Sequence, residues 1–372
     1  AKLTLSPLLL VQKYLKIQKL IKWFSSHDFF ILKLEKLLYN PQLEELIKYL
    51  GNCMKKLLLL LFFMVTYLLA DLVDVYRNQG LDAVRAELEK ELTKKQYWEN
   101  YLSNKNVEYG YYESKEFLII AEKQKKEIKV FKVEKDNYNL LLKEDIIVGE
   151  KEGDKQVEGD LKTPEGAYML TKKLTKLDQF YGPLALVTSY PNTFDKALNK
   201  NGHGIWIHGM PLNEEREKFT QGCIALDNEQ LQVIDKSIAH EKSILLISDE
   251  HLPKTSKEEI STILAAIYKW REAWKKSDIE EYLNFYSESF KNDRGMSLEE
   301  FAKYKKRIFA KKEEKKIVFT NINIAPYPNS LNKNMYKVLM DEDYKTKYYT
   351  FVGKKELYIE LKDNKVQILA EG

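Results

Sequence analysis

The sequence predicts a multidomain protein in which a helical arm is followed by a mainly β domain and then by an α+β domain. Three observations support this fold class. At 372 residues the chain is longer than one hydrophobic core usually organises. The spacing of apolar residues changes from helical to strand-like at about residue 107. After about residue 254 helical patterns come first and strand patterns follow, which is typical of an α+β domain.

Composition places the chain among folded proteins and argues against a nucleic-acid partner. Hydrophobic residues make up 44% and charged residues 31%, which is ordinary for a globular protein. The net charge of +4 arises at the front of the chain, where residues 1–53 hold eight lysines against four acids and Lys55 and Lys56 follow. The rest of the chain is close to neutral, whereas proteins that bind phosphate backbones usually carry a basic surface. We therefore expect no nucleic-acid partner.

Residues 54–70 have the pattern of a signal peptide. Met54-Lys55-Lys56 supplies the charged start, and the apolar run from Leu57 to Ala70 follows. Because this run is shorter than the roughly 20 residues of a membrane span, we predict export to the periplasm, with an uncleaved membrane anchor as the alternative. Residues 1–53 are interpreted as a leader of doubtful status that results from a misplaced start. Their leucine-rich pattern alternatively suits a packing or membrane-surface helix.

Residues 71–106 are predicted to form the helical arm. Apolar residues recur at three- and four-residue steps among charged ones, as in an amphipathic helix, and Gly80 is expected to interrupt it. The arm is predicted either to form a homodimer or to pack back on the next domain, and the pattern does not separate these alternatives. The positions that define it are Leu72, Val75, Tyr76, Leu81, Val84, Leu88 and Leu92.

Residues 107–250 are predicted to form the mainly β domain. Runs of β-branched and aromatic residues alternate with charged turns, which indicates a β-meander. Thr163 to Gly166 marks a turn, and Asn228 to Ile238 suits a short helix. The predicted strands are Phe117 to Ile120, Ile128 to Val133, Ile146 to Val148, Ala167 to Leu170, Leu184 to Ser189, Gly204 to His208 and Ile244 to Ile247.

Residues 254–372 are predicted to form the α+β domain. Ser256 with Glu259 gives a capping-box start to a long helix that continues through Trp270 and Trp274. The lysine-rich stretch 303–316 is interpreted as the solvated face of a helix and its exit. Two more helices are predicted, one with Tyr282, Phe285 and Tyr286 and one from Leu298 to Phe309. The predicted strands are Ile317 to Phe319, Tyr336 to Met340, Lys347 to Val352, Leu357 to Leu361 and Val366 to Leu369.

Cys223 and His208 are the candidate nucleophile and base. Export removes Cys53 with the signal peptide, so Cys223 is left without a partner for an internal disulfide. A thiol attacks as thiolate, and a neighbouring imidazole can take its proton and later return it to a leaving amine. Gly222 lets the chain approach a substrate closely, and backbone N–H groups around Cys223 suit an oxyanion. The alternative is a buried, inert cysteine.

Nearby histidines raise the alternative of a metal site. His203 and His208 with Cys223 supply suitable ligand atoms, but the five-residue step between the histidines places them on opposite faces of a strand. No fourth ligand is evident. We therefore predict no metal and no cofactor, with His203 as a supporting group near the site and with His240 and His251 on the surface.

Spaced motifs follow one another along about residues 115–248. They are Lys162-Thr163-Pro164-Glu165-Gly166-Ala167-Tyr168, Tyr181-Gly182-Pro183, Tyr190-Pro191-Asn192, Ile207-His208-Gly209 and Thr220-Gln221-Gly222-Cys223-Ile224. This series resembles the YkuD-type L,D-transpeptidase family. The resemblance implies a β-sandwich-like catalytic domain that acts on the stem peptides of bacterial peptidoglycan. It also implies an acyl-enzyme on Cys223, His208 as acid and base, and the Gly209 carbonyl as the group that orients the His208 ring.

Departures from the family pattern bear on the reaction. Many cross-linking members carry Ser-His or Ser-Arg before Gly-Cys and an Arg two residues after the Cys, whereas Thr220, Gln221 and Ala225 stand there in this chain. The missing Arg removes a guanidinium able to hold a carboxylate. The whole pattern resembles the L,D-carboxypeptidases that set helical cell shape in Helicobacter and Campylobacter relatives. That resemblance implies hydrolysis of the acyl-enzyme, which releases the terminal D-alanine of a tetrapeptide and leaves a tripeptide.

Two alternative functions stay open. An amine that resolves the acyl-enzyme would make the protein a cross-linking L,D-transpeptidase, and a protein without catalysis would bind the cell wall through its C-terminal domain. Residues 254–372 resemble the nuclear-transport-factor-2-like cone fold, through the Trp270 to Trp274 helix, Tyr282 to Tyr286, and Lys354 to Tyr358. This resemblance implies a pocket whose aromatic side chains suit a glycan, with an ordinary aromatic core as the alternative.

Overall fold

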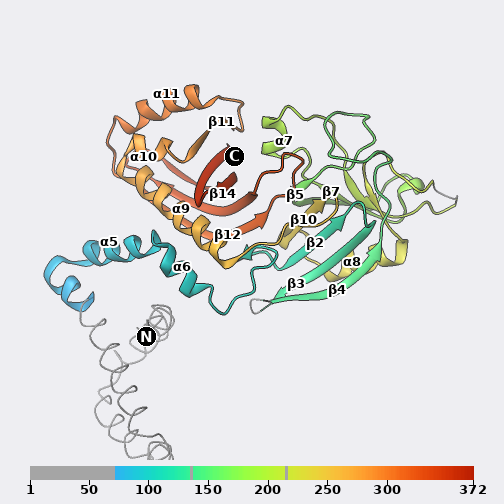
Figure 1. Ribbon diagram of the computed structural model, residues 1–372, viewed down its shortest axis with the longest axis horizontal. Coiled ribbons are helices and arrows are strands. Elements are labelled where there is room, and N and C mark those ends of the chain that lie inside the picture. Colours follow the sequence, from blue (N-terminus) through green and yellow to red (C-terminus); the bar gives the residue numbers. More distant parts are fainter. Residues whose placement is uncertain (1–71, 135–136, 214–216) are drawn as a thin grey trace, which may run out of the picture. The chain divides into compact units, whose positions relative to one another are not determined.

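The computed structural model describes residues 72–134, 137–213 and 217–372, and the chain divides into two compact units between Tyr101 and Leu102 (Figure 1). The leader 1–53 and the predicted signal peptide 54–70 lie outside the described residues. In the part of the chain that is described, no helix has both the length and the apolar character needed to cross a membrane.

The described part of the smaller unit is helical. Residues 72–79 form one helix, Gly80 has a φ of +83°, and α5 (Leu81–Leu92) begins directly after it. The predicted interruption at Gly80 is therefore confirmed. Glycine adopts a positive φ at little cost, which explains why the helix breaks at this residue. A further break at Thr93 separates α5 from α6 (Lys95–Tyr101), in which the indole Nε1 of Trp98 donates to the Leu92 carbonyl at 2.8 Å. Dimerisation through this arm stays a prediction.

The first sheet of the β domain has five strands in the order β4-β3-β2-β10-β5. Its central strands are β2 (Phe117–Glu122) and β10 (Ser243–Ser248), which pair in parallel although one opens the domain and the other closes it. Both are buried at every position, which explains their unbroken apolar runs. The flanking strands are β3 (Glu127–Glu134), β4 (Asn137–Asp145) and β5 (Gly166–Tyr168).

The second sheet of the β domain has four strands in the order β6-β7-β8-β9. They are β6 (Leu170–Leu174), β7 (Ala185–Thr188), β8 (Trp206–His208) and β9 (Ile224–Ala225). One buried core joins both sheets to α8 (Asn228–Ser237), and two sheets over one core confirm the sandwich-like fold class. Members of this core include Ile119, Val130, Leu186, Ile207, Ile224, Leu231 and Leu245.

The C-terminal domain supplies five strands of a six-stranded sheet, ordered β1-β12-β13-β14-β15-β11, in which β1 is Tyr111–Tyr112, and helices lie along one side (Figure 1). The predicted capping box is confirmed, since Ser256 and Glu259 bond to each other's backbone N–H at the start of α9. The indole of Trp270 stacks on Phe319, with ring centroids 5.7 Å apart, and so packs α9 on the sheet. The elements are α9 (Lys257–Lys276), α10 (Ile279–Leu283), β11 (Tyr286–Asn292), α11 (Leu298–Phe309), β12 (Lys316–Pro326), β13 (Met335–Lys345), β14 (Thr350–Lys362) and β15 (Lys365–Glu371).

The β domain and the C-terminal domain share a buried junction. Strand β1 (Tyr111–Tyr112), which precedes β2 in the chain, pairs with β12 of the C-terminal sheet. From the β domain, α7 (Thr193–Ala197) contributes Phe194, whose ring lies 5.6 Å from that of Tyr327 and 5.7 Å from that of Tyr358. The larger unit is therefore one packed body rather than two linked ones.

The structure corrects the sequence prediction at four segments. The edge strand β4 carries no strand prediction, although Tyr138, Leu140 and Leu142 alternate along it and Tyr138 and Leu142 pack against buried residues. The predicted strand Ile146 to Val148 forms only an isolated bridge from Ile147 to Ala225. Tyr286 begins β11 instead of extending a helix, and Lys347 to Val352 is part turn and part of the single long strand β14.

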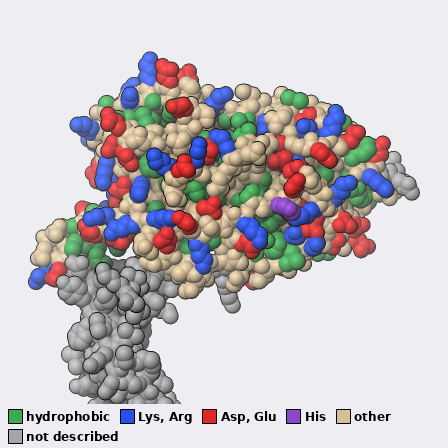
Figure 2. Space-filling model, viewed as in Figure 1, with side chains coloured by type: hydrophobic (Ala, Val, Ile, Leu, Met, Phe, Trp, Pro, Cys, Tyr) green, Lys and Arg blue, Asp and Glu red, His purple; other side chains and the backbone are tan. Residues whose placement is uncertain are grey.

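Charged side chains of both signs mix on the surface. Figure 2 shows lysine and arginine side chains interspersed with acidic ones across its visible face. Exposed pairs such as Lys254 with Glu108, 2.7 Å apart, neutralise each other locally. The described surface in this view therefore has the near-neutral balance that the sequence predicts for the body of the chain.

Candidate active site

Strands β8 and β9 bring the predicted base and nucleophile to one face of the second sheet. The two strands are parallel neighbours, with Ile207 opposite Ile224 and His208 opposite Ala225. Cys223 stands directly before β9. Because side chains on a strand alternate between its faces, Cys223 shares the face of Ala225 and is a diagonal neighbour of His208. A single strand pairing thus joins two motifs that are separate in the sequence.

The ring of His208 is buried and its orientation is fixed by the backbone. Its Nδ1 lies 2.7 Å from the Gly209 carbonyl oxygen. Because a carbonyl only accepts, we assign the hydrogen to Nδ1 and the lone pair to Nε2. The ring of Tyr181 meets the imidazole edge-on, with centroids 5.1 Å apart. This tautomer makes Nε2 the nitrogen that can accept a proton.

The turn before Cys223 is braced by Thr220. The Thr220 hydroxyl donates to the Cys223 carbonyl at 2.7 Å and accepts from the Gly222 N–H at 3.0 Å. Thr220 is only 2% exposed, so it shapes the turn from inside. The Gly222 N–H is therefore already engaged within the turn. The thiol of Cys223 donates to the Gly204 carbonyl at 3.3 Å.

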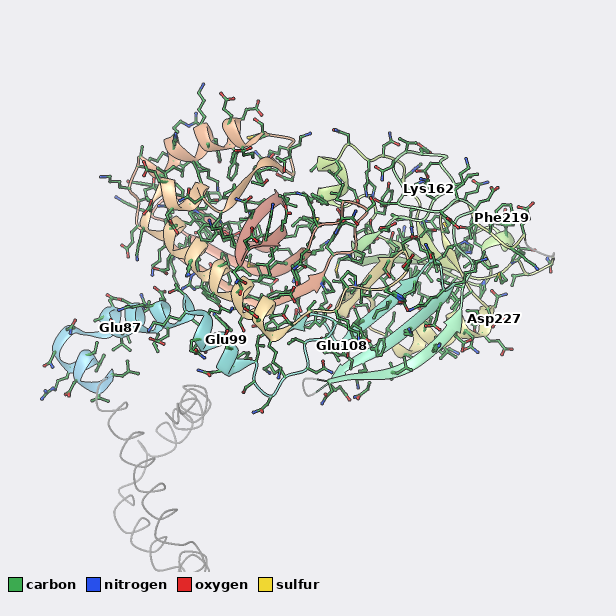
Figure 3. The ribbon with its side chains drawn as sticks, in the orientation of Figure 1. Glu87, Glu99, Glu108, Lys162, Phe219 and Asp227 are labelled. Carbon is green, nitrogen blue, oxygen red and sulfur yellow. The ribbon has the colours of Figure 1, made fainter. Side chains whose placement is uncertain are left out.

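Two glycines of the site have no room for a side chain. A Cβ on Gly209 would lie 2.1 Å from Asn228 Oδ1, and one on Gly222 would lie 2.7 Å from the carbonyl oxygen of Lys162, which is labelled in Figure 3. The Asn228 side chain accepts from the Met210 N–H at 2.9 Å and donates to the Met210 carbonyl at 3.1 Å. Asn228 therefore fixes the segment that carries the Gly209 carbonyl. The sequence pattern indicates only a helix start at Asn228, so this role has no sequence signal.

The other predicted site residues differ in their surroundings. Ala225 is fully buried opposite His208, whereas Gln221 is exposed beside the nucleophile. The side chain of His203 is 79% exposed, and its Nδ1 lies 3.6 Å from Glu158. Among the described residues, no group of three His, Cys, Asp or Glu side chains is arranged to hold a metal ion.

A cavity of about 560 Å³ adjoins the turn that Thr220 braces. A bridge between Gly149 and Thr220, and a 3.0 Å hydrogen bond from the Glu150 N–H to the Thr220 carbonyl, hold one wall of the cavity against this turn. Phe219, labelled in Figure 3, adds an aromatic ring. Amines and carboxylates together suit a peptide that carries both signs of charge. The charged lining residues are Lys123, Lys126, Glu150, Lys151, Glu152, Lys218 and Asp249.

The C-terminal domain holds a second concentration of charge among aromatic rings. The Lys305 amine lies 4.8, 5.3 and 5.0 Å from the ring centres of Trp274, Tyr282 and Phe301. Burial lowers the pKa of Lys305 to about 8. This corrects the prediction that the whole stretch 303–316 is solvated. Nearby, burial opposes the ionisation of Glu371, but Lys355 and Lys305 outweigh it and lower its pKa.

Comparison with known proteins gives two family matches. The family described as the L,D-transpeptidase catalytic domain matches residues 116–239. The family described as the Cds6 C-terminal NTF2-like domain matches residues 262–372. The first range contains both His208 and Cys223, and the second contains the Lys305 cluster.

Solved structures extend the similarity over both domains. The helical cell shape determining protein Pgp2 from Campylobacter jejuni is 40% identical with a TM-score of 0.71, and the match covers 75% of this chain and 99% of Pgp2. Bd1075 from Bdellovibrio bacteriovorus is 27% identical with a TM-score of 0.57, over 72% of this chain and 95% of Bd1075. A shorter match, 33% identical over 82 residues, is to YafK from Escherichia coli and spans 22% of this chain and 30% of YafK.

Proposed function

The chain belongs to the YkuD-type L,D-transpeptidase family, with a C-terminal NTF2-like domain, and we propose that it is a periplasmic, cysteine-dependent L,D-carboxypeptidase of peptidoglycan stem tetrapeptides. The fixed ring of His208 carries this proposal. Its Nδ1 bonds to the Gly209 carbonyl, which leaves Nε2 as the proton acceptor, and the pairing of β8 with β9 sets Cys223 two residues before the partner of His208. The similarity to Pgp2 supports a role in cell shape.

The first half of the proposed reaction forms an acyl-enzyme. His208 Nε2 takes the thiol proton of Cys223, and Sγ attacks the carbonyl carbon that joins the third residue of the stem to D-alanine. Backbone N–H groups of the turn stabilise the tetrahedral oxyanion. When this intermediate collapses, the C–N bond breaks, and His208 returns its proton to the alanine amine. Free D-alanine leaves, and the tripeptide stays on Cys223 as a thioester.

The second half of the proposed reaction hydrolyses the thioester. His208 takes a proton from water, the hydroxide attacks the thioester carbon, and the C–S bond breaks. The proton returns to the sulfur, so that the tripeptide acid leaves and the thiol is restored. Neither Gln221 nor Ala225 offers a guanidinium to hold the carboxylate of a second stem peptide. Their chemistry favours water over an acceptor amine.

The test incubates the purified protein with disaccharide tetrapeptide and follows the products by mass. Loss of one alanine by the wild type, absent in Cys223→Ala, is the expected result. Dimeric muropeptides would instead identify a transpeptidase. Retention on sacculi with no product, equal in Cys223→Ala and wild type, would identify a wall-binding protein without catalysis.

The alternative function, binding of the wall by the C-terminal domain, finds no support in the Lys305 cluster. The rings around the Lys305 amine belong to Trp274, Tyr282 and Phe301, which are 7%, 0% and 3% exposed, so their faces are not open to a sugar. The cluster fits the alternative of an ordinary aromatic core.

A further inference from the structure

The loop between α7 and β8 connects Cys223 with the domain junction. At its end, the Gly204 carbonyl accepts from the Cys223 thiol at 3.3 Å. The next carbonyl, of Ile205, accepts from the backbone N–H of Thr188 at 3.1 Å and from its hydroxyl at 2.8 Å. The start of the loop lies at Lys200. The position of this loop therefore decides where the Gly204 carbonyl meets the thiol.

Lys200 anchors the loop through two buried carboxylates. Its amine lies 2.6 Å from Asp154 Oδ2 and 3.2 Å from Asp195 Oδ1, and the three side chains are 5%, 3% and 0% exposed. Asp195 also accepts from the Asn192 N–H at 3.0 Å, and Asp154 accepts from the Glu165 N–H at 2.9 Å. The two acids thus tie Lys200 to α7 on one side and to the start of β5 on the other.

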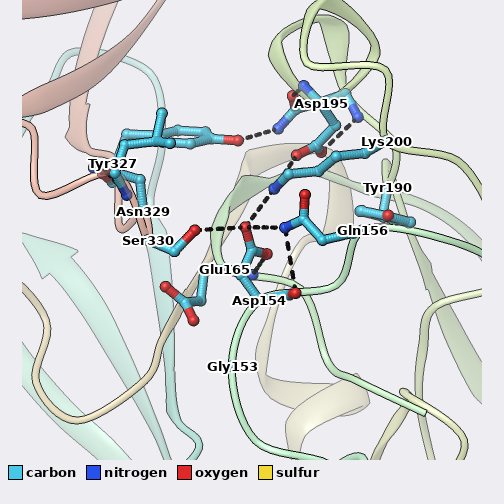
Figure 4. A network of polar contacts seen from close by, with 12 residues as sticks. Gly153, Asp154, Gln156, Glu165, Tyr190, Asp195, Lys200, Tyr327, Asn329 and Ser330 are labelled. Carbon is cyan, nitrogen blue, oxygen red and sulfur yellow. Dashed lines mark hydrogen bonds and ion pairs between the residues drawn. The ribbon is translucent and has the colours of Figure 1, made fainter. Parts of the chain in front are cut away.

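The C-terminal domain completes this cluster with two hydroxyls. Ser330 Oγ donates to Asp154 Oδ2 at 3.3 Å, and Tyr327 Oη accepts from Asn192 Nδ2 at 3.0 Å. Figure 4 shows Tyr327 and Ser330 on one side of the cluster and Gln156 and Tyr190 on the other. Both hydroxyls come from the segment that follows β12. The anchor of the loop is therefore built from both domains.

Further buried contacts hold the two sides of the junction in register. The amine of Lys337, which is 1% exposed, donates to the Ala167 carbonyl of β5 at 3.3 Å and lies 3.0 Å from Glu356. The Thr193 hydroxyl of α7 donates to the Glu356 carboxylate. Because Phe194 of α7 packs on the Tyr327 ring, Tyr327 is held against α7, whereas Ser330 is exposed.

A buried ion cluster is a costly way to stabilise a fold. Apolar side chains of similar volume often serve stability equally well, whereas a charge that loses one partner is expensive. Hydrogen bonds and ion pairs are directional, so they fix the geometry of the loop more narrowly than apolar packing does. We infer that Tyr327 and Ser330 are positioning residues, which hold the loop that places the Gly204 carbonyl against Cys223. The inference rests on the proposed function only in treating Cys223 as the nucleophile.

The first test measures the thiol without any substrate. Iodoacetamide modification of Cys223 is followed by peptide mass in the full chain, so that Cys53 does not interfere. The double variant Tyr327→Phe with Ser330→Ala should modify Cys223 about three- to tenfold more slowly at pH 7, the factor expected for one or two lost hydrogen bonds. Its rate-against-pH curve should also shift to higher pH.

Tyr336→Phe is the matched control for this test. It removes a hydroxyl from a buried tyrosine that bonds to Glu259 within the C-terminal domain. The control should keep the wild-type alkylation rate, while its melting temperature should fall by about as much as that of the double variant. An alkylation rate in the double variant equal to that of the wild type, or equal losses in the double variant and the control, would overturn the inference.

A second readout separates positioning from substrate binding. With tetrapeptide, the double variant should lower kcat by a similar factor and change KM by less than about twofold, because the cluster touches no substrate. Lys200→Met should lower the alkylation rate and kcat further than the double variant does. Lys200→Arg keeps the positive charge and should lose less than Lys200→Met. If Lys200→Met does not fold, the inference is judged from the double variant of Tyr327 and Ser330 alone. If the wild type releases no D-alanine, the proposed function fails, and the alkylation rates alone judge the inference.

Discussion

His208 and Lys305 are both nitrogen bases among aromatic side chains, but they are held by opposite means. The imidazole of His208 bonds to the backbone carbonyl of Gly209 and meets one tyrosine ring. The amine of Lys305 lies over three rings, and the charged groups that act on it are Glu371, Lys355 and Glu342. The carbonyl partner of His208 never titrates, whereas all the charged groups that act on Lys305 do.

This difference teaches what each region is suited to do. A carbonyl accepts from Nδ1 in both the neutral and the protonated ring, so it keeps the ring orientation as the charge changes, which suits repeated proton transfer at one nitrogen. A lysine whose charge depends on burial and neighbouring acids makes the stability of the domain depend on pH. Four variants would break or sharpen this comparison.

Removing the base should have the largest effect. His208→Ala should reduce release of D-alanine by about 10³-fold or more and should slow alkylation of Cys223 near neutral pH, because no group then accepts the thiol proton. Muropeptide mass analysis and alkylation kinetics measure the two effects. Tyr181→Phe keeps the ring beside the imidazole and should change little. Unchanged alkylation in His208→Ala would refute the role of His208 as the base.

Displacing the Gly209 carbonyl should have the next largest effect. Gly209→Ala forces a Cβ against Asn228 Oδ1, with a contact of 2.1 Å before relaxation, so the peptide that orients His208 must shift. We expect kcat to fall by roughly 100-fold, since small misplacement of a reacting group is costly. Asn228→Ala removes the bonds to Met210 without adding a Cβ. Comparing the two variants separates crowding from lost hydrogen bonds, and wild-type kcat in Gly209→Ala would show that the carbonyl does not orient the ring.

The Lys305 cluster should make the stability of the protein depend on pH. The pKa of Lys305 is about 8 in the folded protein against an ordinary value of 10.5, so the unfolded chain binds more protons between these values. Wild-type unfolding free energy should therefore rise relative to Lys305→Met as the pH increases from about 8 to 10.5, by about 3 kcal/mol. Urea unfolding at several pH values measures this difference, and a constant gap would contradict the buried amine.

The loop before β5 supplies the smallest effect and a third way to hold a charge. Burial opposes the ionisation of Asp160, but Lys155 and the backbone N–H groups of Gln156, Val157 and Lys162 outweigh it and lower its pKa to about 2. Asp160→Asn should cost about 1–2 kcal/mol of unfolding free energy at pH 7. The difference should shrink as the pH falls from about 4 to 2, because a depressed carboxyl pKa stabilises only above that range. Glu158→Gln, on the same loop but exposed, should show no such loss.

Much of the fold could be predicted because local signals were strong. The long apolar runs of β2 and β10, the capping box at Ser256, and the helix from Leu298 to Phe309 all match the structure. The start of β11 at Tyr286 could not be predicted, because it carries no apolar period of its own. Edge strand β4 was missed although Tyr138, Leu140 and Leu142 alternate along it, because most of its side chains are exposed and its ends are polar. Pairing with a neighbouring strand decides their conformation.

The candidate site divides in the same way. Cys223, His208 and Gly209 belong to short motifs whose residue types carry the chemistry, and Thr220 and Ala225 belong with them. Asn228 and Lys200 carry no motif, and their contacts reach Met210, Asp154 and Asp195 from other parts of the chain. Residue types therefore predict which groups react but not which groups hold them in place.

The sequence by itself determined the family resemblance and predicted the order of domains and the candidate reactive pair, because these depend on residue types at short spacing. Only the tertiary structure decided that β8 and β9 are neighbours, that Lys305 lies among aromatic rings, and that Tyr327 and Ser330 reach the loop beside Cys223. Such contacts join residues far apart in the chain. They are set by how buried surfaces pack and by the need to pair every buried charge, which no local pattern records.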